Sequence, residues 1–151
     1  MNIKLSKFRT IIAMCLVCVL VFPVPVSAAV PETATPCASY YLDAYNTYIC
    51  AMGGGEIQIW FEVMGTGYMD EIGTLSIKLY ESTDNSNWTL VETFLHEDNE
   101  TMLIEDDYWH MDYVSYDGIA RRYYKAYVCI WAGKNNGGDT RYMWATSVRA
   151  T

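Results

Sequence analysis

The sequence predicts an all-β fold. Residues that favour strands are abundant, including 13 tyrosines and five tryptophans. No window shows a convincing helical period, and clusters of turn-forming residues recur at the spacing of an all-β sandwich or barrel. Seven strands are predicted between residues 39 and 151, which we expect to form a single domain.

The second predicted strand, residues 56–63, shows the clearest alternation of apolar and polar side chains, the pattern of a strand with one buried face. Its inward positions are Ile57, Ile59, Phe61 and Val63. A first strand at about 39–51 and a glycine-rich turn at 52–55 precede it. A loop over 65–73 leads to the third strand, whose inward positions are Leu75, Ile77 and Leu79.

Polar segments separate the next two predicted strands. A hairpin loop at 82–87, rich in Ser, Asp and Asn, leads to the fourth strand at 88–95. An acidic loop over 96–107 then leads to the fifth strand at about 108–116.

The sixth predicted strand, residues 122–132, has two chemically different faces. One face carries small and branched residues and is predicted to be buried, namely Tyr124, Ala126, Val128 and Ile130. The other carries Tyr123, Lys125, Tyr127, Cys129 and Trp131. After a hairpin loop at 134–139, the seventh strand has Tyr142, Trp144 and Val148 on its more apolar face.

Seven strands in a domain of this size match an antiparallel sandwich of the immunoglobulin or fibronectin-III type. The sixth and seventh strands resemble the closing hairpin of a fibronectin-III domain. The Cys…Trp…Cys spacing of a true immunoglobulin domain is absent. A partly open β-barrel is the alternative.

The first 29 residues have the organisation of a secretory signal peptide. Lys4, Lys7 and Arg9 precede an apolar run over 11–22, and small residues follow at 26–29. The run is shorter than the roughly 20 residues of a membrane-spanning helix. We therefore expect a secreted protein, with a signal peptide at 1–29 and a short tether at 30–38.

The remaining chain is strongly acidic. The first 29 residues contain three of the ten basic residues and none of the 18 acidic ones, so seven basic residues face 18 acidic ones, a net charge of −11. Such a charge repels nucleic acid and anionic membranes. We expect no nucleic-acid partner, and the absence of a second long apolar run predicts no membrane span.

The segment at 65–73, GTGYMDEIG, followed by Tyr80 and Glu81, resembles a group of small exported proteins of Gram-positive bacteria classed as domains of unknown function. The segments at 86–91 and 116–124 are also similar to this group, although Arg121 departs from its pattern. The resemblance covers about 39–150. It implies export and a β fold, and it implies no activity because the group has none assigned.

The cysteines leave the disulfide state open. Cys15 and Cys18 leave with the signal peptide, whereas Cys37, Cys50 and Cys129 remain. One disulfide with one free thiol is expected in an oxidising compartment, and three reduced thiols in an anaerobic one.

The sequence predicts no catalytic residues, no metal and no cofactor. The acidic runs at 97–100 and 105–107 lack the spacing of a calcium-binding loop and indicate a solvated segment. His96 and His110 are not accompanied by a Gly-x-Ser-x-Gly nucleophile motif, so both are interpreted as structural or exposed.

One group of side chains indicates binding. Parity on the third and sixth strands places Tyr80, Tyr123, Tyr127 and Trp131 outward, beside Lys78, Lys125 and Cys129. Exposed aromatic rings mixed with cations suit a glycan or a protein partner, although cross-strand stabilisation explains them equally well. The leading hypothesis is a secreted, non-enzymatic module that recognises an extracellular glycan, wall component or protein. A self-associating structural protein and a small hydrolase using the acidic loop are the alternatives.

Overall fold

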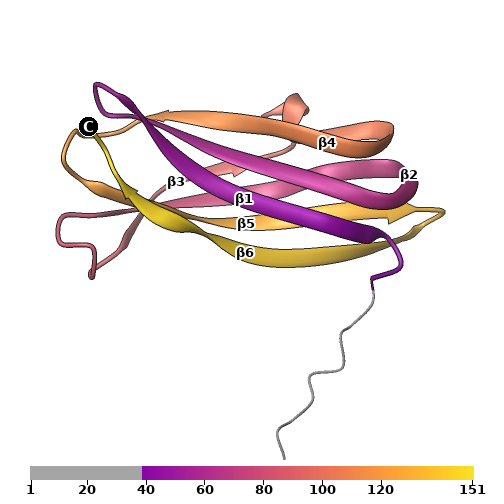
Figure 1. Ribbon diagram of the computed structural model, residues 1–151. Helices are drawn as coiled ribbons and strands as arrows, with labels where there is room; N and C mark the ends of the chain where they lie inside the picture. The colour runs from indigo at the N-terminus through magenta and orange to yellow at the C-terminus, as the bar shows by residue number, and fades with distance from the viewer. Residues whose placement is uncertain (1–38) are drawn as a thin grey trace, which may run out of the picture. The chain divides into compact units, whose positions relative to one another are not determined.

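The computed structural model describes residues 39–151, which form an all-β fold with antiparallel pairing throughout (Figure 1). The strands are β1 (Leu42–Gly53), β2 (Glu56–Ser82), β3 (Thr89–Leu95), β4 (Leu103–Asp117), β5 (Tyr123–Lys134) and β6 (Gly137–Arg149), with a short 3-10 helix, η1 (Glu100–Met102), before β4. The predicted signal peptide (1–29), the predicted tether (30–38) and Cys37 lie outside the described residues. Within residues 39–151 no helix is long and apolar enough to cross a membrane.

β2 is the central strand, and it bends back on itself. Its first half pairs with β1, where Gly65 lies opposite Leu42, and its second half pairs with β5, where Glu71 lies opposite Gly133. The second and third predicted strands are therefore one element, and the predicted loop at 65–73 is strand that forms the bend (Figure 1). Because β3, β4 and β5 also pair with β2, the sheet curls into a half-open barrel.

Two residues inside the strands of this sheet have positive φ. Gly73 in β2 has a φ of +146°, and a Cβ there would lie 2.2 Å from the carbonyl oxygen of Met102, so a side chain does not fit. In β4, Asp106 has a φ of +55°. The predicted acidic loop at 96–107 is shorter than expected, since its last residues belong to η1 and β4.

The core lies inside the curl and contains most of the predicted inward side chains. Its fully buried apolar members include Ile57, Ile59, Phe61, Val63, Ile77, Leu79, Tyr124, Ala126, Val128 and Ile130. Alternation along β2 and β5 therefore identified the buried faces correctly. The all-β antiparallel fold is confirmed, with partly open barrel character, while the closer likeness to immunoglobulin and fibronectin-III domains stays a prediction.

β-Bulges change two of the predicted strand faces, one in β2 and one in β6. Leu75 is half-buried rather than inward, since it is an extra residue between Thr74 and Ser76 in the pairing with β5. A second bulge in β6 lies between Ala145 and Val148. The three residues predicted on one face of the last strand are therefore separated. Val148 packs against the core, whereas Tyr142 and Trp144 are exposed.

The β5–β6 hairpin is tighter than predicted. Asn135 and Asn136 alone connect the two strands, with φ values of +52° and +62°. Positive φ at both central residues characterises the type I′ turn, whose twist matches that of a two-stranded hairpin. The turn lies at the same end of the domain as the β2 bend, because the amide of Asn135 donates to Oδ2 of Asp70 at 2.7 Å.

Candidate functional site

The outer face of the β2–β5–β6 sheet carries four aromatic side chains in contact, which we call the aromatic platform: Tyr80, Tyr127, Tyr142 and Trp144. The ring centroids of Tyr127 and Trp144 are 4.7 Å apart, and Tyr80 lies 5.4 Å from Trp144. Tyr142 stacks on Tyr127 at 5.6 Å with an interplanar angle of 12°. The platform remains open to solvent, since Trp144 is 49% and Tyr142 is 61% exposed.

Polar contacts hold the rings of the platform in place. Nζ of Lys125 lies 4.5 Å from the ring centroid of Trp144 and 4.4 Å from that of Trp88. Tyr142 hydrogen-bonds to Cys129, and this contact raises the pKa of the Tyr142 hydroxyl. Burial raises the pKa of the Cys129 thiol. The platform is therefore supported from its own strands and does not depend on a ligand for its arrangement.

The structure brings together two of the four predicted binding residues. Tyr80 and Tyr127 belong to the platform, whereas Tyr123 lies under the guanidinium of Arg149, 5.6 Å from it. Trp131 lies four residues beyond Tyr127 on the same face of β5, or about 13 Å along the strand. Sequence analysis missed Tyr142 and Trp144 as partners because it placed them on the apolar face of the last strand.

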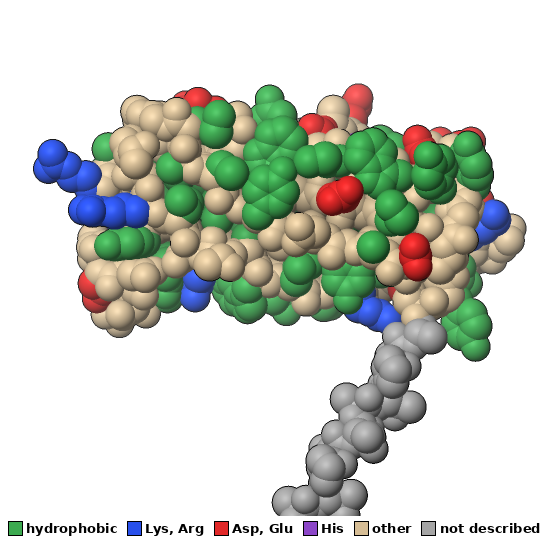
Figure 2. All heavy atoms as spheres, viewed as in Figure 1, with side chains coloured by type: hydrophobic (Ala, Val, Ile, Leu, Met, Phe, Trp, Pro, Cys, Tyr) green, Lys and Arg blue, Asp and Glu red, His purple; other side chains and the backbone are tan. Residues whose placement is uncertain are grey.

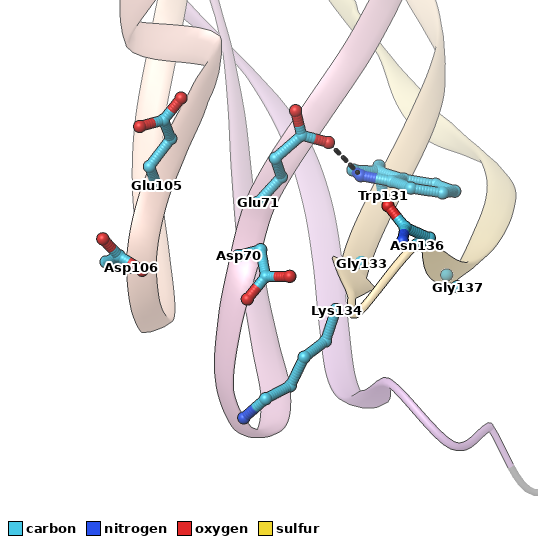
Figure 3. A pocket seen from close by; sticks show the side chains of 10 residues that line it. Asp70, Glu71, Glu105, Asp106, Trp131, Gly133, Lys134, Asn136 and Gly137 are labelled. Atoms are coloured by element: carbon cyan, nitrogen blue, oxygen red, sulfur yellow. Dashed lines mark hydrogen bonds between the residues drawn. The ribbon is translucent and has the colours of Figure 1, made fainter.

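Trp131 forms a wall of a pocket at the end of the domain where β2 and β4 bend (Figure 3). The cavity measures about 520 Å³. Its lining comes from β2, β4 and the β5–β6 hairpin, and comprises Asp70, Glu71, Glu105, Asp106, Trp131, Gly133, Lys134, Asn136, Gly137 and Gly138. We call it the end pocket.

Two glycines, which lack a Cβ, leave space for the Trp131 ring in the end pocket. A Cβ on Gly138 would lie 2.3 Å from Cη2 of Trp131, and one on Gly133 would lie 2.7 Å from Cζ2. Neither position accommodates a side chain without moving the ring. Nε1 of Trp131 donates to Oε2 of Glu71 at 3.1 Å, which fixes the orientation of the indole (Figure 3).

The end pocket has an excess of negative charge. Its lining has four carboxylates and one cation, Lys134, whose Nζ donates to the backbone carbonyl of Tyr68 at 2.7 Å. Within residues 39–151 the ion pairs are Glu81–Arg122 and His96–Glu97, so no pocket carboxylate is in an ion pair there.

Nothing in the sequence indicated the pocket carboxylates on β2. Those on β4 were interpreted only as part of a solvated acidic run. The two sets meet because Glu71 and Glu105 are paired residues of β2 and β4. In the described part of the chain, no group of three or more His, Cys, Asp or Glu side chains is placed to hold a metal ion.

A second row of rings lies on the face formed by β1, β2 and β4. Trp60 lies 4.5 Å from Tyr113 and 6.0 Å from Tyr48, centroid to centroid. Trp109 donates from Nε1 to Oε1 of Glu62 at 3.0 Å. Figure 2 shows hydrophobic side chains spread along this side of the molecule with acidic groups among them. Exposed rings are thus present on both outer faces.

The remaining candidate groups have structural roles in the described residues. Nε2 of His110 lies 2.7 Å from the carbonyl oxygen of Thr101, and its ring packs edge-on against Phe61. This agrees with the structural interpretation of that histidine. Within residues 39–151, Cys50 and Cys129 are free thiols.

No protein-family model matches the sequence, and no curated protein matches it. Among solved structures, the chain is similar to the crystal structure of Spo0M, a sporulation control protein from Bacillus subtilis. The two share 10% sequence identity with a TM-score of 0.38, over 68% of this chain and 49% of that chain. The chain thus spans about half the length of that protein, and a likeness this distant carries no argument about function.

Proposed function

We propose that this protein is a secreted, non-enzymatic recognition module that binds an extracellular glycan through the aromatic platform. The observation that carries the proposal is the contact between Tyr127 and Trp144 at 4.7 Å, in a group of rings that stays exposed. The proposal includes export, which rests on residues 1–29. It also includes kinship with small exported proteins of Gram-positive bacteria, which rests on the motif at 65–73.

A sugar suits the chemistry of the platform. The faces of pyranose rings are apolar and stack on aromatic side chains, while their hydroxyls need hydrogen-bond partners at the edge. Lys78 and Lys125 place ammonium donors on the same outer face as the rings. Because the rings are already held by Lys125 and Cys129, little side-chain freedom is lost on binding.

Exposure distinguishes this arrangement from rings that only stabilise a sheet. Cross-strand aromatic pairs gain stability by covering each other. Tyr142 and Trp144 cover Tyr127 but leave much of their own surface in solvent, at the edge strand β6. An apolar patch of several adjoining rings marks an interaction surface more often than scattered single rings do.

The test is the double variant Tyr142→Ala/Trp144→Ala, compared with Trp109→Ala/Tyr113→Ala on the opposite face. The control removes rings that are each 40% exposed, so it changes surface aromaticity to a similar extent. Affinity electrophoresis and pull-down on insoluble wall polysaccharide, cellulose, xylan and chitin measure binding. We expect the platform variant to lose retention on the glycan that the unaltered protein binds, and the control to keep it.

Three results would contradict the proposal. The first is equal retention of both double variants. The second is a loss of several kcal/mol of unfolding free energy in the platform variant, because the rings would then be part of the packed structure. The third is release of reducing ends from the bound glycan, which would make the protein a hydrolase.

A further inference from the structure

We infer that the end pocket is a separate binding site for an organic cation that carries a primary ammonium group. This site does not require the aromatic platform to bind a glycan. A volume of about 520 Å³ is within the range of small-molecule sites, which is about 300–1,000 Å³. The pocket therefore has room for a molecule much larger than a single ion.

The charge of the lining selects a cation. Glu71, Glu105 and Asp106 belong to no ion pair within residues 39–151. Lys134 forms no ion pair with them, because its ammonium donates to the Tyr68 carbonyl at the β2 bend (Figure 3). An ammonium ligand in the cavity would supply the missing positive charge and donate hydrogen bonds to carboxylate oxygens.

The tryptophan wall selects an organic ligand over a bare ion. A cation within about 6 Å of an indole centroid is attracted by the ring, and an adjoining carbon chain packs on the same face. The hydrogen bond from Trp131 to Glu71 fixes the orientation of the indole for such a contact. Gly133 and Gly138 leave space for the ring.

The placement of the carboxylates argues against a metal site. Glu105 and Asp106 come from β4, whereas Glu71 comes from β2 and accepts a hydrogen bond from Trp131 of β5 (Figure 3). The described residues contain no convergent set of three ligating side chains. A calcium ion needs six to eight oxygen ligands at short range. An ammonium group needs fewer carboxylate oxygens, and the carbon skeleton that carries it can contact the Trp131 ring.

Four probes test the inference by isothermal titration calorimetry and by the change in tryptophan fluorescence of the purified protein. They are 1,5-diaminopentane, a glucosamine trisaccharide with free amines, its fully N-acetylated counterpart, and calcium chloride. We expect the amines to bind and the N-acetylated sugar to fail, with affinity falling as salt is added. Binding by the diamine alone or by the amino sugar alone identifies the source of the ammonium group.

Charge-matched variants locate the site. Glu105→Gln/Asp106→Asn removes two pocket carboxylates, and Glu97→Gln/Asp98→Asn removes two exposed ones that do not line the pocket. We expect the first variant, and Trp131→Ala, to weaken amine binding about tenfold or more, and the second to change it less than about twofold. Thermal melting curves confirm that each variant is folded.

The inference is overturned if the N-acetylated sugar binds as tightly as the free amine, or if calcium binds and the amines do not. Equal weakening by the two charge-matched variants would also overturn it. That result would attribute the effect to the net charge of the protein. Loss of glycan binding in the Tyr142→Ala/Trp144→Ala variant leaves these results unaffected, so the two proposals fail separately.

Discussion

Tyr124 shows how a single buried hydroxyl orders a loop. Its Oη donates to Oε2 of Glu81 at 2.5 Å and accepts a hydrogen bond from the amide of Ile119 at 2.8 Å. Arg122 completes the cluster with an ion pair of 2.7 Å to Glu81. Burial, and then the hydrogen bond to Glu81, raise the pKa of Tyr124 from 10.0 to about 12. The turn between β4 and β5 is therefore tied to Glu81 of β2 through Tyr124 and Arg122.

We expect Tyr124→Phe to lower the unfolding free energy by about 1–3 kcal/mol at neutral pH, because the Ile119 amide and Glu81 each lose a partner. The raised pKa also predicts a pH dependence. The contribution of Tyr124 is complete below pH 10.0, the unfolded value, and is lost as pH rises through about 12. Urea unfolding across this range measures both effects.

The neighbouring Tyr123→Phe serves as the control for this prediction, since Tyr123 is only half-buried and contacts Arg149 from the outer face. It should leave stability nearly unchanged at neutral pH. A Tyr124→Phe variant that keeps the full alkaline loss between pH 10.0 and 12 would show that another group causes it.

At the scale of elements, regular alternation was sufficient to predict the buried faces, and bulges were not predictable. Along 56–63 the alternation of burial holds without interruption, and in β5 all four predicted inward residues are buried, although Cys129 on the predicted outward face is buried as well. At Leu75 the extra residue is set by how Thr74 and Ser76 pair with β5. Hydrogen bonding to a partner strand determines such a shift, and a single strand's sequence does not record it.

Two truncations in β2 test this reading of parity. Phe61→Ala should cost about 3–5 kcal/mol of unfolding free energy, the range for a buried phenylalanine. Leu75→Ala should cost about 1 kcal/mol or less, because its side chain is half-buried on the bulge. Chemical denaturation of both variants measures the difference. Equal losses would mean that Leu75 is a core residue after all.

At the scale of the whole molecule, the proposed binding residues are of two kinds: those that lie on one strand and those that strand pairing brings together. Tyr127 and Trp131 belong to one strand, so the sequence predicted them as outward rings on a shared face. The end pocket depends on Glu71 meeting Glu105, which are 34 positions apart and become neighbours only through β2–β4 pairing. No local sequence pattern indicates such a contact, so the end pocket was not predicted.

The prediction of export also concerns the whole molecule, and it rests on residues outside the described fold. We expect the protein recovered from culture medium to begin near Ala29 or Val30, because small residues at 26–29 follow the apolar run. Mass spectrometry of the intact secreted protein measures its N-terminus. A soluble cytoplasmic product that retains Met1 would contradict this prediction.

The bend in β2 has a consequence for how the chain folds. One continuous strand belongs to both halves of the curled sheet, and β4 pairs with both of these halves, so we expect them to form and open as one unit. Its second half pairs with β5, which lies about 50 positions later in the chain. Contacts so distant in sequence slow folding towards milliseconds to seconds. Amide protons of β2 in both halves should therefore exchange with solvent at a common rate, set by opening of the entire domain.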